Sequence, residues 1–361
     1  MSKSIRIGII GTGGIAGQHL RSYRMIEDVE VVAVADIVPG KAENFVRRWE
    51  IPHVTAFEDY RKMLELDLDG VSVCTPNAAH FHPTVDALRA GKHVMLEKPM
   101  SVTLEESIEM VGTAKETGLL LNVGFQPRYD PNMKTIHDFI QSGQLGKVYY
   151  VETGGGRRRG MPGGTFIRKE LAGAGAMADI GCYSLDLALH ALGYPKPLTV
   201  SASTTNHFGT NAIYHPEAAS FDVEDFGTAL IRLEGDLVLN FKISWAMHMD
   251  TLGGTMFLGT DAGLKVTPSG KGPWSGVFDG GVGSMTLYHD VRGHHVESSI
   301  PIIEHKLDLF VEKVRDFVRA IRDNAPAPIS GEQILRNQAI IDGFLRSSQL
   351  KREVEVHIPN I

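Results

Sequence analysis

The stretch Ile5-Arg-Ile-Gly-Ile-Ile-Gly-Thr-Gly-Gly-Ile-Ala16 decides the fold of the first part of this 361-residue chain. Residues 5–10 are mostly apolar, which is typical of a strand buried on both faces of a sheet. A Gly-x-Gly-x-x-Ala turn follows, with Gly11 for the tight turn, Gly13 for close approach of a ligand, and Ala16 for helix packing. The stretch predicts a strand, a turn and a helix whose free N–H groups can bind phosphate.

The same pattern continues through the first third of the chain. Runs rich in β-branched residues predict further strands at residues 29–35, 71–74, 93–96 and 119–123. Helical patterns separate them, and the clearest begins with the capping box formed by Thr103 and Glu106 and stops at Gly118. This alternation predicts a Rossmann domain over residues 1–125, with a doubly wound parallel sheet covered by helices on both faces.

The rhythm changes after Phe125. A helix is expected near residues 132–140, a strand at 148–152, and then a loop rich in Gly and Arg. The turn 234–236 separates the strand patterns 229–233 and 237–241, and a turn that short joins antiparallel neighbours. Helical patterns at 179–192, 305–322 and 332–350 and a strand-like run at 353–358 complete a second α/β domain, expected over residues 126–361.

Asp36 ends the second predicted strand, twenty residues after Ala16. A carboxylate at this point can accept hydrogen bonds from the ribose hydroxyls of a dinucleotide, and it would repel a 2′-phosphate. The arrangement therefore favours NAD over NADP. The following basic residues, Lys41, Arg47 and Arg48, can relax that preference.

Two later segments, Thr75-Pro-Asn77 and Glu97-Lys98-Pro99, fall at the carboxyl ends of predicted strands, which is the edge where open parallel sheets bind ligands. Both also fit simple turns. Oxidation of an alcohol by a nicotinamide requires a group that takes the hydroxyl proton. Lys98 is the first candidate, either as an amine whose pKa is lowered by desolvation or as a cation that stabilises an alkoxide.

A second candidate cluster lies in the small-residue segment 173–186. Asp179 and Tyr183 are four residues apart, so a helix places the carboxylate and the phenol on one face, with Asp186 nearby. Both can then act on one substrate. The alternative for Asp179 is the N-cap of the helix that follows.

Composition excludes several classes of partner. A formal net charge of −7 and a pI near 6.1 do not favour nucleic acid or an anionic membrane, and no segment is long and apolar enough to span a bilayer. Strand-like sequence begins within a few residues of Met1, and only Cys74 and Cys182 are present, so we expect a cytoplasmic protein. The histidines lack ligand spacing, and no metal is expected.

With these motifs in order, the chain resembles the glucose-fructose oxidoreductase and inositol dehydrogenase family (Gfo/Idh/MocA). The resemblance covers nearly the whole chain and rests on Gly11-Thr-Gly-Gly, Thr75-Pro-Asn-x-x-His80, Glu97-Lys98-Pro99 and the Asp179 segment. It implies an NAD(P)-dependent oxidoreductase that transfers a hydride between nicotinamide and a sugar, sugar derivative or cyclitol. It also implies a large open sheet in the second domain, mostly antiparallel, that forms a homodimer or homotetramer.

The resemblance further implies roles for single residues. Lys98 matches the catalytic lysine, Asp179 a substrate-binding residue that works with the proton-transfer group, and Arg128 a substrate contact. The residues placed around NAD are Gly11, Gly13, Gly14, Ile15, Asp36, Thr75, Asn77, His80, Glu97 and Gln126.

Tyr183 departs from one branch of that family. Many inositol dehydrogenase-like members have histidine there, whereas tyrosine is similar to the glucose-fructose oxidoreductase and dihydrodiol dehydrogenase branches. Tyr183 is therefore a candidate acid/base, with Lys98 lowering the pKa of its phenol.

The Arg157-Arg-Arg159 run supplies either a substrate contact, for which we select Arg159, or a solvated loop. Two other functions stay open. One is a cofactor-binding regulator without turnover, and the other is an NAD-dependent glycoside hydrolase that oxidises its sugar only transiently.

Overall fold

The computed structural model describes residues 4–250, 252–269 and 281–359, and the chain forms two compact units. The first unit extends from the N-terminus to Gln126 and includes Leu307–Leu335. The second contains Pro127–Lys306 and Arg336–Ile358. The first boundary lies one residue beyond the expected position. Leu307–Leu335 was expected in the second domain, but this segment belongs to the first unit.

The first unit has a six-stranded parallel sheet in the order β3-β2-β1-β4-β5-β6, which confirms the predicted Rossmann architecture. Its strands are β1 (Ile5–Ile10), β2 (Val29–Ala35), β3 (Thr55–Phe57), β4 (Gly70–Val73), β5 (His93–Leu96) and β6 (Leu121–Val123). Its helices include α1 (Gly14–Tyr23), α2 (Lys41–Arg48), α3 (Tyr60–Leu64), α4 (Phe81–Arg89) and α5 (Leu104–Thr117). Sequence reasoning missed β3, which is only three residues long.

Local signals set the ends of α5 as predicted. The Thr103 hydroxyl accepts a hydrogen bond from the N–H of Glu106, and the Glu106 carboxylate accepts one from the N–H of Thr103. The helix ends at Gly118, whose φ of 67° is in the left-handed region that favours glycine.

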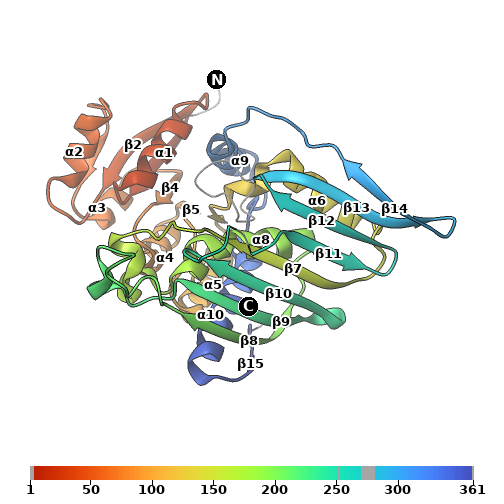
Figure 1. Ribbon diagram of the computed structural model, residues 1–361. Coiled ribbons are helices and arrows are strands. Elements are labelled where there is room, and N and C mark those ends of the chain that lie inside the picture. Colours follow the sequence, from red (N-terminus) through yellow and green to blue (C-terminus); the bar gives the residue numbers. More distant parts are fainter. Residues whose placement is uncertain (1–3, 251, 270–280, 360–361) are drawn as a thin grey trace. The chain divides into compact units, whose positions relative to one another are not determined.

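Helix α9 (Leu309–Asp323), blue in Figure 1, completes the core of the first unit. Asp308 caps it by accepting hydrogen bonds from the N–H groups of Phe310 and Val311. Its apolar side places Val314, Phe317 and Val318 in the same buried cluster as residues of β1, β2 and α1. A helix predicted from its own periodicity therefore packs on elements from the first 35 residues of the chain.

The second unit contains a nine-stranded sheet in the order β14-β13-β12-β11-β7-β10-β9-β8-β15. Only β7 and β10 pair in parallel, and every other described pair of neighbours is antiparallel, which confirms a large, mostly antiparallel sheet. Its strands are β7 (Val148–Gly156), β8 (Pro197–Thr205), β9 (Phe226–Leu233), β10 (Leu237–Ser244), β11 (Thr255–Gly259), β12 (Ala262–Pro268), β13 (Val282–Val291), β14 (His294–Ile300) and β15 (Val354–Glu355).

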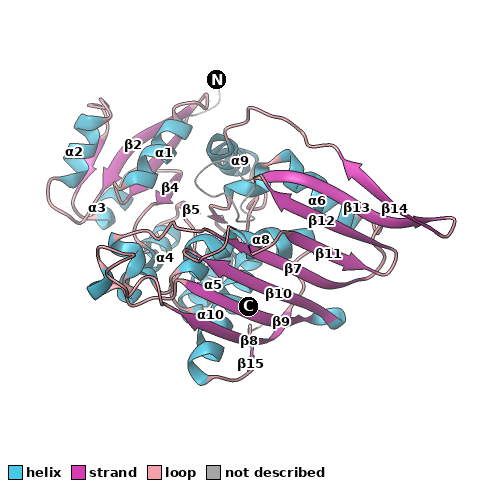
Figure 2. Cartoon of the chain, in the orientation of Figure 1, coloured by secondary structure: helices cyan, strands magenta, loops and turns pink. Residues whose placement is uncertain are grey.

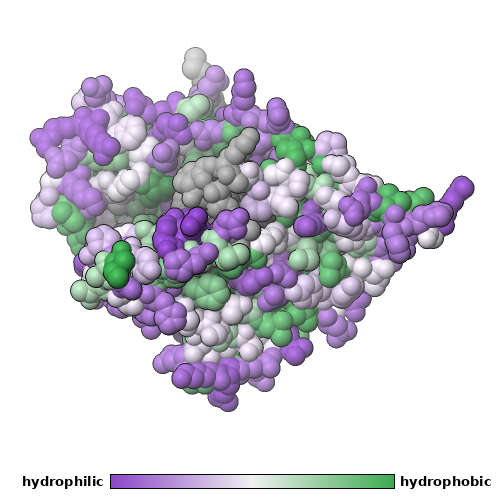
Figure 3. Space-filling view, viewed as in Figure 1, coloured by the Kyte–Doolittle hydropathy of each residue, from purple (hydrophilic) through white to green (hydrophobic). Residues whose placement is uncertain are grey.

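Helices cover one face of this sheet, as Figure 2 shows for α6 (Pro131–Gln141) and α8 (Cys182–Ala191), and α8 packs against β7. The remaining helices are the short α7 (Lys169–Ala172) and α10 (Gly331–Leu350), which begins in the first unit and continues into the second. Alternate residues of β10, including Phe241 and Ile243, are fully buried on the helical side. Hydrophilic residues predominate at the tip of the β13–β14 hairpin (Figure 3).

The glycines at residues 154–156, expected in a loop, extend β7 instead. A Cβ at Gly154 would lie 1.8 Å from the carbonyl oxygen of Lys242 on the neighbouring strand, and φ of Gly154 is 124°. Only glycine allows β7 and β10 to approach this closely. The loop therefore begins at Arg157, at the carboxyl end of both parallel strands.

Candidate active site

The glycine turn after β1 forms a cradle that fits a pyrophosphate. Gly11 has a φ of 86°, and a Cβ there would lie 2.8 Å from the carbonyl oxygen of Cys74. By contrast, nothing lies within 4 Å of a Cβ built on Gly13 or Gly14, so a ligand can approach the backbone. Helix α1 starts at Gly14 without a side-chain cap, which leaves its first N–H groups for an anion.

Asp36 lies at the end of β2 and is 6% exposed. Its Oδ2 accepts hydrogen bonds from Thr12 N–H (2.9 Å) and Thr12 Oγ1 (2.8 Å) and an ion pair from Lys41 Nζ (2.9 Å). Burial alone disfavours the charge, but these donors together lower the pKa of Asp36. The ionised carboxylate is thus fixed beside the glycine turn, where the ribose was predicted to bind.

His80 braces the two segments that follow β4 and β5. Its Nδ1 lies 2.8 Å from the carbonyl oxygen of Pro99, and its Nε2 lies 3.0 Å from that of Thr75. Burial lowers the pKa of His80, although the two carbonyl oxygens oppose the shift. His80 is 1% exposed and holds the segments that were expected around the cofactor. This arrangement does not favour a direct contact between its ring and the cofactor.

Glu97 belongs to a fully buried polar cluster. Its Oε1 accepts a hydrogen bond from Lys313 Nζ of α9 (2.6 Å) and lies 2.7 Å from His19 Nε2 of α1. The charge of Lys313 and the N–H of His19 outweigh the cost of burial and hold the pKa of Glu97 well below its usual range. Glu97 was expected near NAD, and in the structure its carboxylate binds side chains of α1 and α9.

The cluster continues into the sheet as a chain of hydrogen bonds in which each group donates to the next. Because burial lowers the pKa of His19, its ring is neutral and donates through Nε2 to Glu97. Its Nδ1 then accepts from Ser72 (2.9 Å), whose oxygen accepts from Tyr23 (2.8 Å). Glycine-turn helix α1, strand β4 and the segment that carries Lys98 are therefore held together by buried hydrogen bonds.

The other predicted residues of this unit lie at the same carboxyl edge of the sheet. Lys98 is half-buried and lies two residues after the end of β5, while Asn77 begins a single 3₁₀ turn after β4. Ile15 lies in the first turn of α1 and packs partly against the core, and Gln126 ends the N-terminal segment of the unit. The sheet thus brings the glycine turn, Asp36 and Lys98 to one edge.

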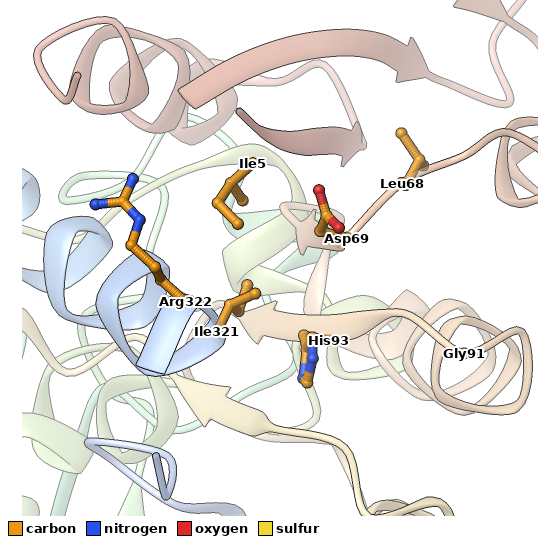
Figure 4. Close-up of a pocket in the computed structure, with 7 residues that line it drawn as sticks. All are labelled: Ile5, Leu68, Asp69, Gly91, His93, Ile321 and Arg322. Atoms are coloured by element: carbon orange, nitrogen blue, oxygen red, sulfur yellow. The ribbon is translucent and has the colours of Figure 1, made fainter. Parts of the chain in front are cut away.

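A cavity of about 440 Å³ in the first unit lies elsewhere (Figure 4). Ile5, Asp69 and His93 line it from the amino ends of strands, opposite the edge that carries the glycine turn. Asp69 accepts a hydrogen bond from the N–H of Arg6, and His93 accepts one from the N–H of Leu120. These contacts serve the fold, and the cavity is not the candidate active site.

In the second unit, Asp179 lies in a single π-helical turn (Met177–Gly181) immediately before α8. Its Oδ2 accepts a hydrogen bond from the indole Nε1 of Trp245 at 3.0 Å. The turn has no side-chain cap, so the alternative of an N-cap for Asp179 is not seen. Tyr183 follows on α8, and the two side chains are equally buried, at 8% exposure. One helical segment thus holds both.

Glu224 fixes the backbone that leads into this turn. Its buried carboxylate accepts hydrogen bonds from the N–H groups of Gly175 (2.9 Å) and Met177 (3.0 Å). A Cβ at Gly175 would lie 2.0 Å from the carbonyl oxygen of Glu224, so the contact requires glycine. Burial raises the pKa of Glu224, although these N–H donors oppose the rise.

Arg128 is engaged within the second unit. Its Nε and Nη2 lie 2.8 and 2.7 Å from the two carboxylate oxygens of Asp186, and the hydroxyl of Tyr194 donates to Asp186 at 2.5 Å. The Arg128 side chain is 5% exposed. This bidentate pair ties the turn after Gln126 to α8, so the arrangement supports a structural role for Arg128 more directly than a substrate contact.

Arg159 is exposed but held in place. Its Nη1 donates to the carbonyl oxygens of Arg158 (2.6 Å) and Met247 (2.7 Å), and the guanidinium carbon lies 4.8 Å and 5.0 Å from the ring centres of Phe208 and Tyr214. It follows β7, and Trp245 follows β10, so Arg159 and the Trp245–Asp179 pair lie at the same edge of this sheet.

Sequence reasoning missed His19, Glu224, Trp245 and Lys313. Lys313 carried a signal, because it stands between Val311 and Val314 on the apolar side of a strongly amphipathic helix. The other three resemble ordinary core or turn residues in the sequence. Within residues 4–250, 252–269 and 281–359, no three His, Cys, Asp or Glu side chains are grouped to hold a metal ion. No described helix is long and apolar enough to cross a membrane.

Comparison with known proteins gives matches for both units. Residues 5–125 match the family model of the oxidoreductase family with NAD-binding Rossmann fold, and residues 133–265 match the GFO/IDH/MocA C-terminal domain. The chain is 33% identical over 277 residues to D-glucoside 3-dehydrogenase of Escherichia coli, covering 74% of this chain and 78% of that protein. It is 24% identical to myo-inositol 2-dehydrogenase of Thermotoga maritima over 99% of both chains.

Solved structures share the fold along the whole chain. Levoglucosan dehydrogenase in complex with NADH superimposes with a TM-score of 0.82 at 20% identity, covering 99% of this chain and all of that one. Aldose-aldose oxidoreductase from Caulobacter crescentus superimposes with a TM-score of 0.79 at 22% identity, covering 98% of this chain. On these matches and the geometry of the glycine turn, the chain belongs to the GFO/IDH/MocA family and is an NAD-binding oxidoreductase.

Proposed function

We propose that the chain transfers a hydride between NAD and a carbinol or ketone carbon of a pyranose sugar, a sugar derivative or, as a second choice, a cyclitol. Lys98, Asp179 and Tyr183 handle the proton and orient the substrate. The relative with 33% identity is a D-glucoside 3-dehydrogenase, whereas the inositol dehydrogenase from Thermotoga maritima is 24% identical. This difference and the tyrosine at position 183 favour the sugar.

The position of Lys98 carries the proposal. It follows β5 at the carboxyl edge of the parallel sheet, where the glycine turn follows β1 and the Thr75 segment follows β4. Because β1, β4 and β5 are consecutive neighbours in the sheet, Lys98 lies on the cofactor edge of its unit.

The open cradle at Gly13 and Gly14 fits the pyrophosphate of a dinucleotide. Gly11, Gly13, Gly14 and Ile15 would hold that group, Asp36 the ribose, and Thr75, Asn77 and Gln126 the rest of the cofactor. Glu97 and His80 support this edge from within. When bound, the nicotinamide supplies the hydride acceptor or donor.

The proton is handled by this chain's own side chains. In oxidation, the hydroxyl proton passes to the Lys98 amine or to the Tyr183 phenolate, and in reduction the same group returns it. The Asp179 carboxylate accepts a hydrogen bond from a substrate hydroxyl and orients the ring. Arg159, fixed over two aromatic rings at the same sheet edge as Asp179, donates to an outer oxygen of the substrate.

We also propose that copies of the chain associate through the outer face of the second sheet. The residues on that face alternate with the buried ones, and Tyr150, Leu230 and Met256 are among its partly exposed apolar members. Light scattering after size-exclusion chromatography would give twice or four times the 39.5 kDa chain mass. A single chain mass at micromolar concentration contradicts this part of the proposal.

The function is tested by adding NAD or NADP to the purified protein with D-glucosides, aldoses, anhydrosugars and inositols, and following the absorbance of the reduced nicotinamide. We expect reduction of NAD with a sugar. Lys98→Met should lower kcat by about 10²–10⁴-fold, the usual contribution of a positioned acid or base, while NAD still binds in calorimetry. Lys62→Met, on the exposed side of α3, is the matched control.

Full turnover in Lys98→Met would reject the role of Lys98. If the parent protein binds NAD but reduces it with no substrate, release of an aryl group from a glycoside would identify a redox-assisted hydrolase. Binding without either reaction would identify a regulator.

A further inference from the structure

Trp245 is a fully buried residue that the proposed chemistry does not yet use. It follows the last residue of β10, and its indole Nε1 donates to Asp179 Oδ2 at 3.0 Å. Its backbone N–H donates to the carbonyl oxygen of Asp225 at 2.8 Å, and Phe221 packs edge-on against its ring with 6.2 Å between centroids. Both the backbone and the ring of Trp245 are therefore fixed, and so is the direction of its N–H.

Asp179 is held from its backbone as well. The carboxylate of Glu224 accepts hydrogen bonds from the N–H groups of Gly175 and Met177, and its carbonyl oxygen accepts one from the N–H of Ala176 at 3.0 Å. These bonds fix the entry to the π-helical turn that carries Asp179. A single π turn in an α-helix is a costly local geometry that is often found at functional sites. The remaining freedom of Asp179 is rotation of its side chain.

We propose that Trp245 is a positioning residue for the reaction: its indole N–H holds one oxygen of Asp179 and so sets the direction in which the carboxylate meets a substrate hydroxyl. This inference rests on the proposed function, in which Asp179 orients the substrate. A charge-assisted hydrogen bond to a buried donor fixes a carboxylate more firmly than solvent does. Small errors in the orientation of a reacting group lower the rate strongly.

The substitution Trp245→Phe separates this role from packing, because it keeps an aromatic ring in the buried site and removes the N–H. The carboxylate oxygen then lacks its indole donor, while the backbone bonds of Glu224 to the turn and of Trp245 to Asp225 are unchanged in kind. We expect kcat/KM for the sugar to fall about tenfold, with little change in the affinity for NAD.

Phe257→Leu is the matched structural control, since Phe257 is fully buried in β11 of the same sheet and has no part in the site. Both variants are assayed well below their Tm values. We expect Phe257→Leu to lower Tm and leave kcat/KM nearly unchanged. Equal kcat/KM losses in the two variants would overturn the inference, because packing would then explain both.

A double-mutant cycle provides the decisive readout. If Trp245 acts through Asp179, then Trp245→Phe has no further effect on the residual turnover of Asp179→Ala. Losses that multiply across the two positions would overturn the proposal.

A measurement without turnover separates this inference from the proposed function. The chain has three tryptophans, so ¹⁵N spectra show up to three indole N–H signals, and Trp245→Phe identifies one by its disappearance. That signal should move in Asp179→Ala, and an unchanged signal would show that the pair does not form in solution. Parent-level turnover of Asp179→Ala would instead reject the role of Asp179 in the proposed function, even if the signal moves.

Discussion

The Asp36 carboxylate shows how neighbouring donors keep one buried residue charged. Thr12 and Val38 supply it with backbone N–H donors, and Lys41 lies 2.9 Å from it. These donors keep the pKa of Asp36 low, so a negative charge is present at neutral pH where an adenosine ribose would lie. A 2′-phosphate meets like charge there. Lys41 is half exposed, and it can turn to a phosphate once the carboxylate is gone.

We therefore predict that Asp36→Ser moves the preference toward NADP. Removing one like charge and releasing Lys41 should lower the ratio of kcat/KM for NAD to that for NADP by at least about tenfold. Steady-state kinetics with both cofactors and one substrate measure this ratio. The double variant Asp36→Ser/Lys41→Met should lose the gain for NADP. An unchanged ratio in the single variant would show that Asp36 does not face the ribose.

Single residues were predictable where a local motif defines them. Gly11 and Asp36 follow strands that are evident from their apolar runs, and Lys98 follows a third. Trp245 was not predictable, because its partner Asp179 is 66 residues away and only the parallel pairing of β7 with β10 defines that sheet edge. Residues that position others over long distances leave no spacing pattern in the sequence.

Helix α9 illustrates the same limit for whole elements. Its amphipathic pattern predicted the helix, yet nothing local indicates that it packs in the first unit next to α1. Strand β3 was too short to give a pattern, and the π turn before α8 was predicted as ordinary helix. The long apolar strands and the capping box of α5 were predicted because their signals lie within one element.

The ion pair between Lys313 of α9 and Glu97 gives a prediction about how α9 is held. Both side chains are buried, so removing one partner leaves a charge without compensation. We predict that Lys313→Met lowers the free energy of unfolding by about 3 kcal/mol or more. The double variant Glu97→Gln/Lys313→Met buries no unpaired charge and should recover much of that loss. Urea unfolding of the parent, the single variant and the double variant measures these free energies.

The matched control is Lys115→Met, which breaks an exposed pair with Glu332 in the same unit. It should cost less than about 1 kcal/mol, because water screens an exposed pair. If Lys313→Met proves as mild as Lys115→Met, the buried cluster does not hold α9. A double variant less stable than Lys313→Met would mean that the hydrogen bonds, and not charge balance, dominate.

At the scale of the whole molecule, each unit has its own sheet and its own histidines with a lowered pKa, fully buried in the first unit and partly buried in the second. Burial lowers the pKa of His19 and His80 in the first unit, and it lowers the pKa of His190 in the second unit to about 3. An unfolded chain binds protons at these histidines near pH 6.5, whereas the folded protein does not. Acid therefore favours the unfolded chain at each of these positions, in both units.

His190 tests this effect in the second unit, where it lies near the end of α8. Its folded pKa is depressed, so its contribution is fully present above the unfolded pKa and is lost as pH falls below it. We predict that His190 accounts for about 1.4 kcal/mol of the stability lost between pH 7.5 and pH 5.5. Urea unfolding of the parent and of His190→Asn at both pH values gives this quantity as a difference of differences, in which the titration of groups that do not contact His190 cancels. Equal losses in the two proteins would mean that His190 takes up its proton in the folded state, which would contradict the prediction.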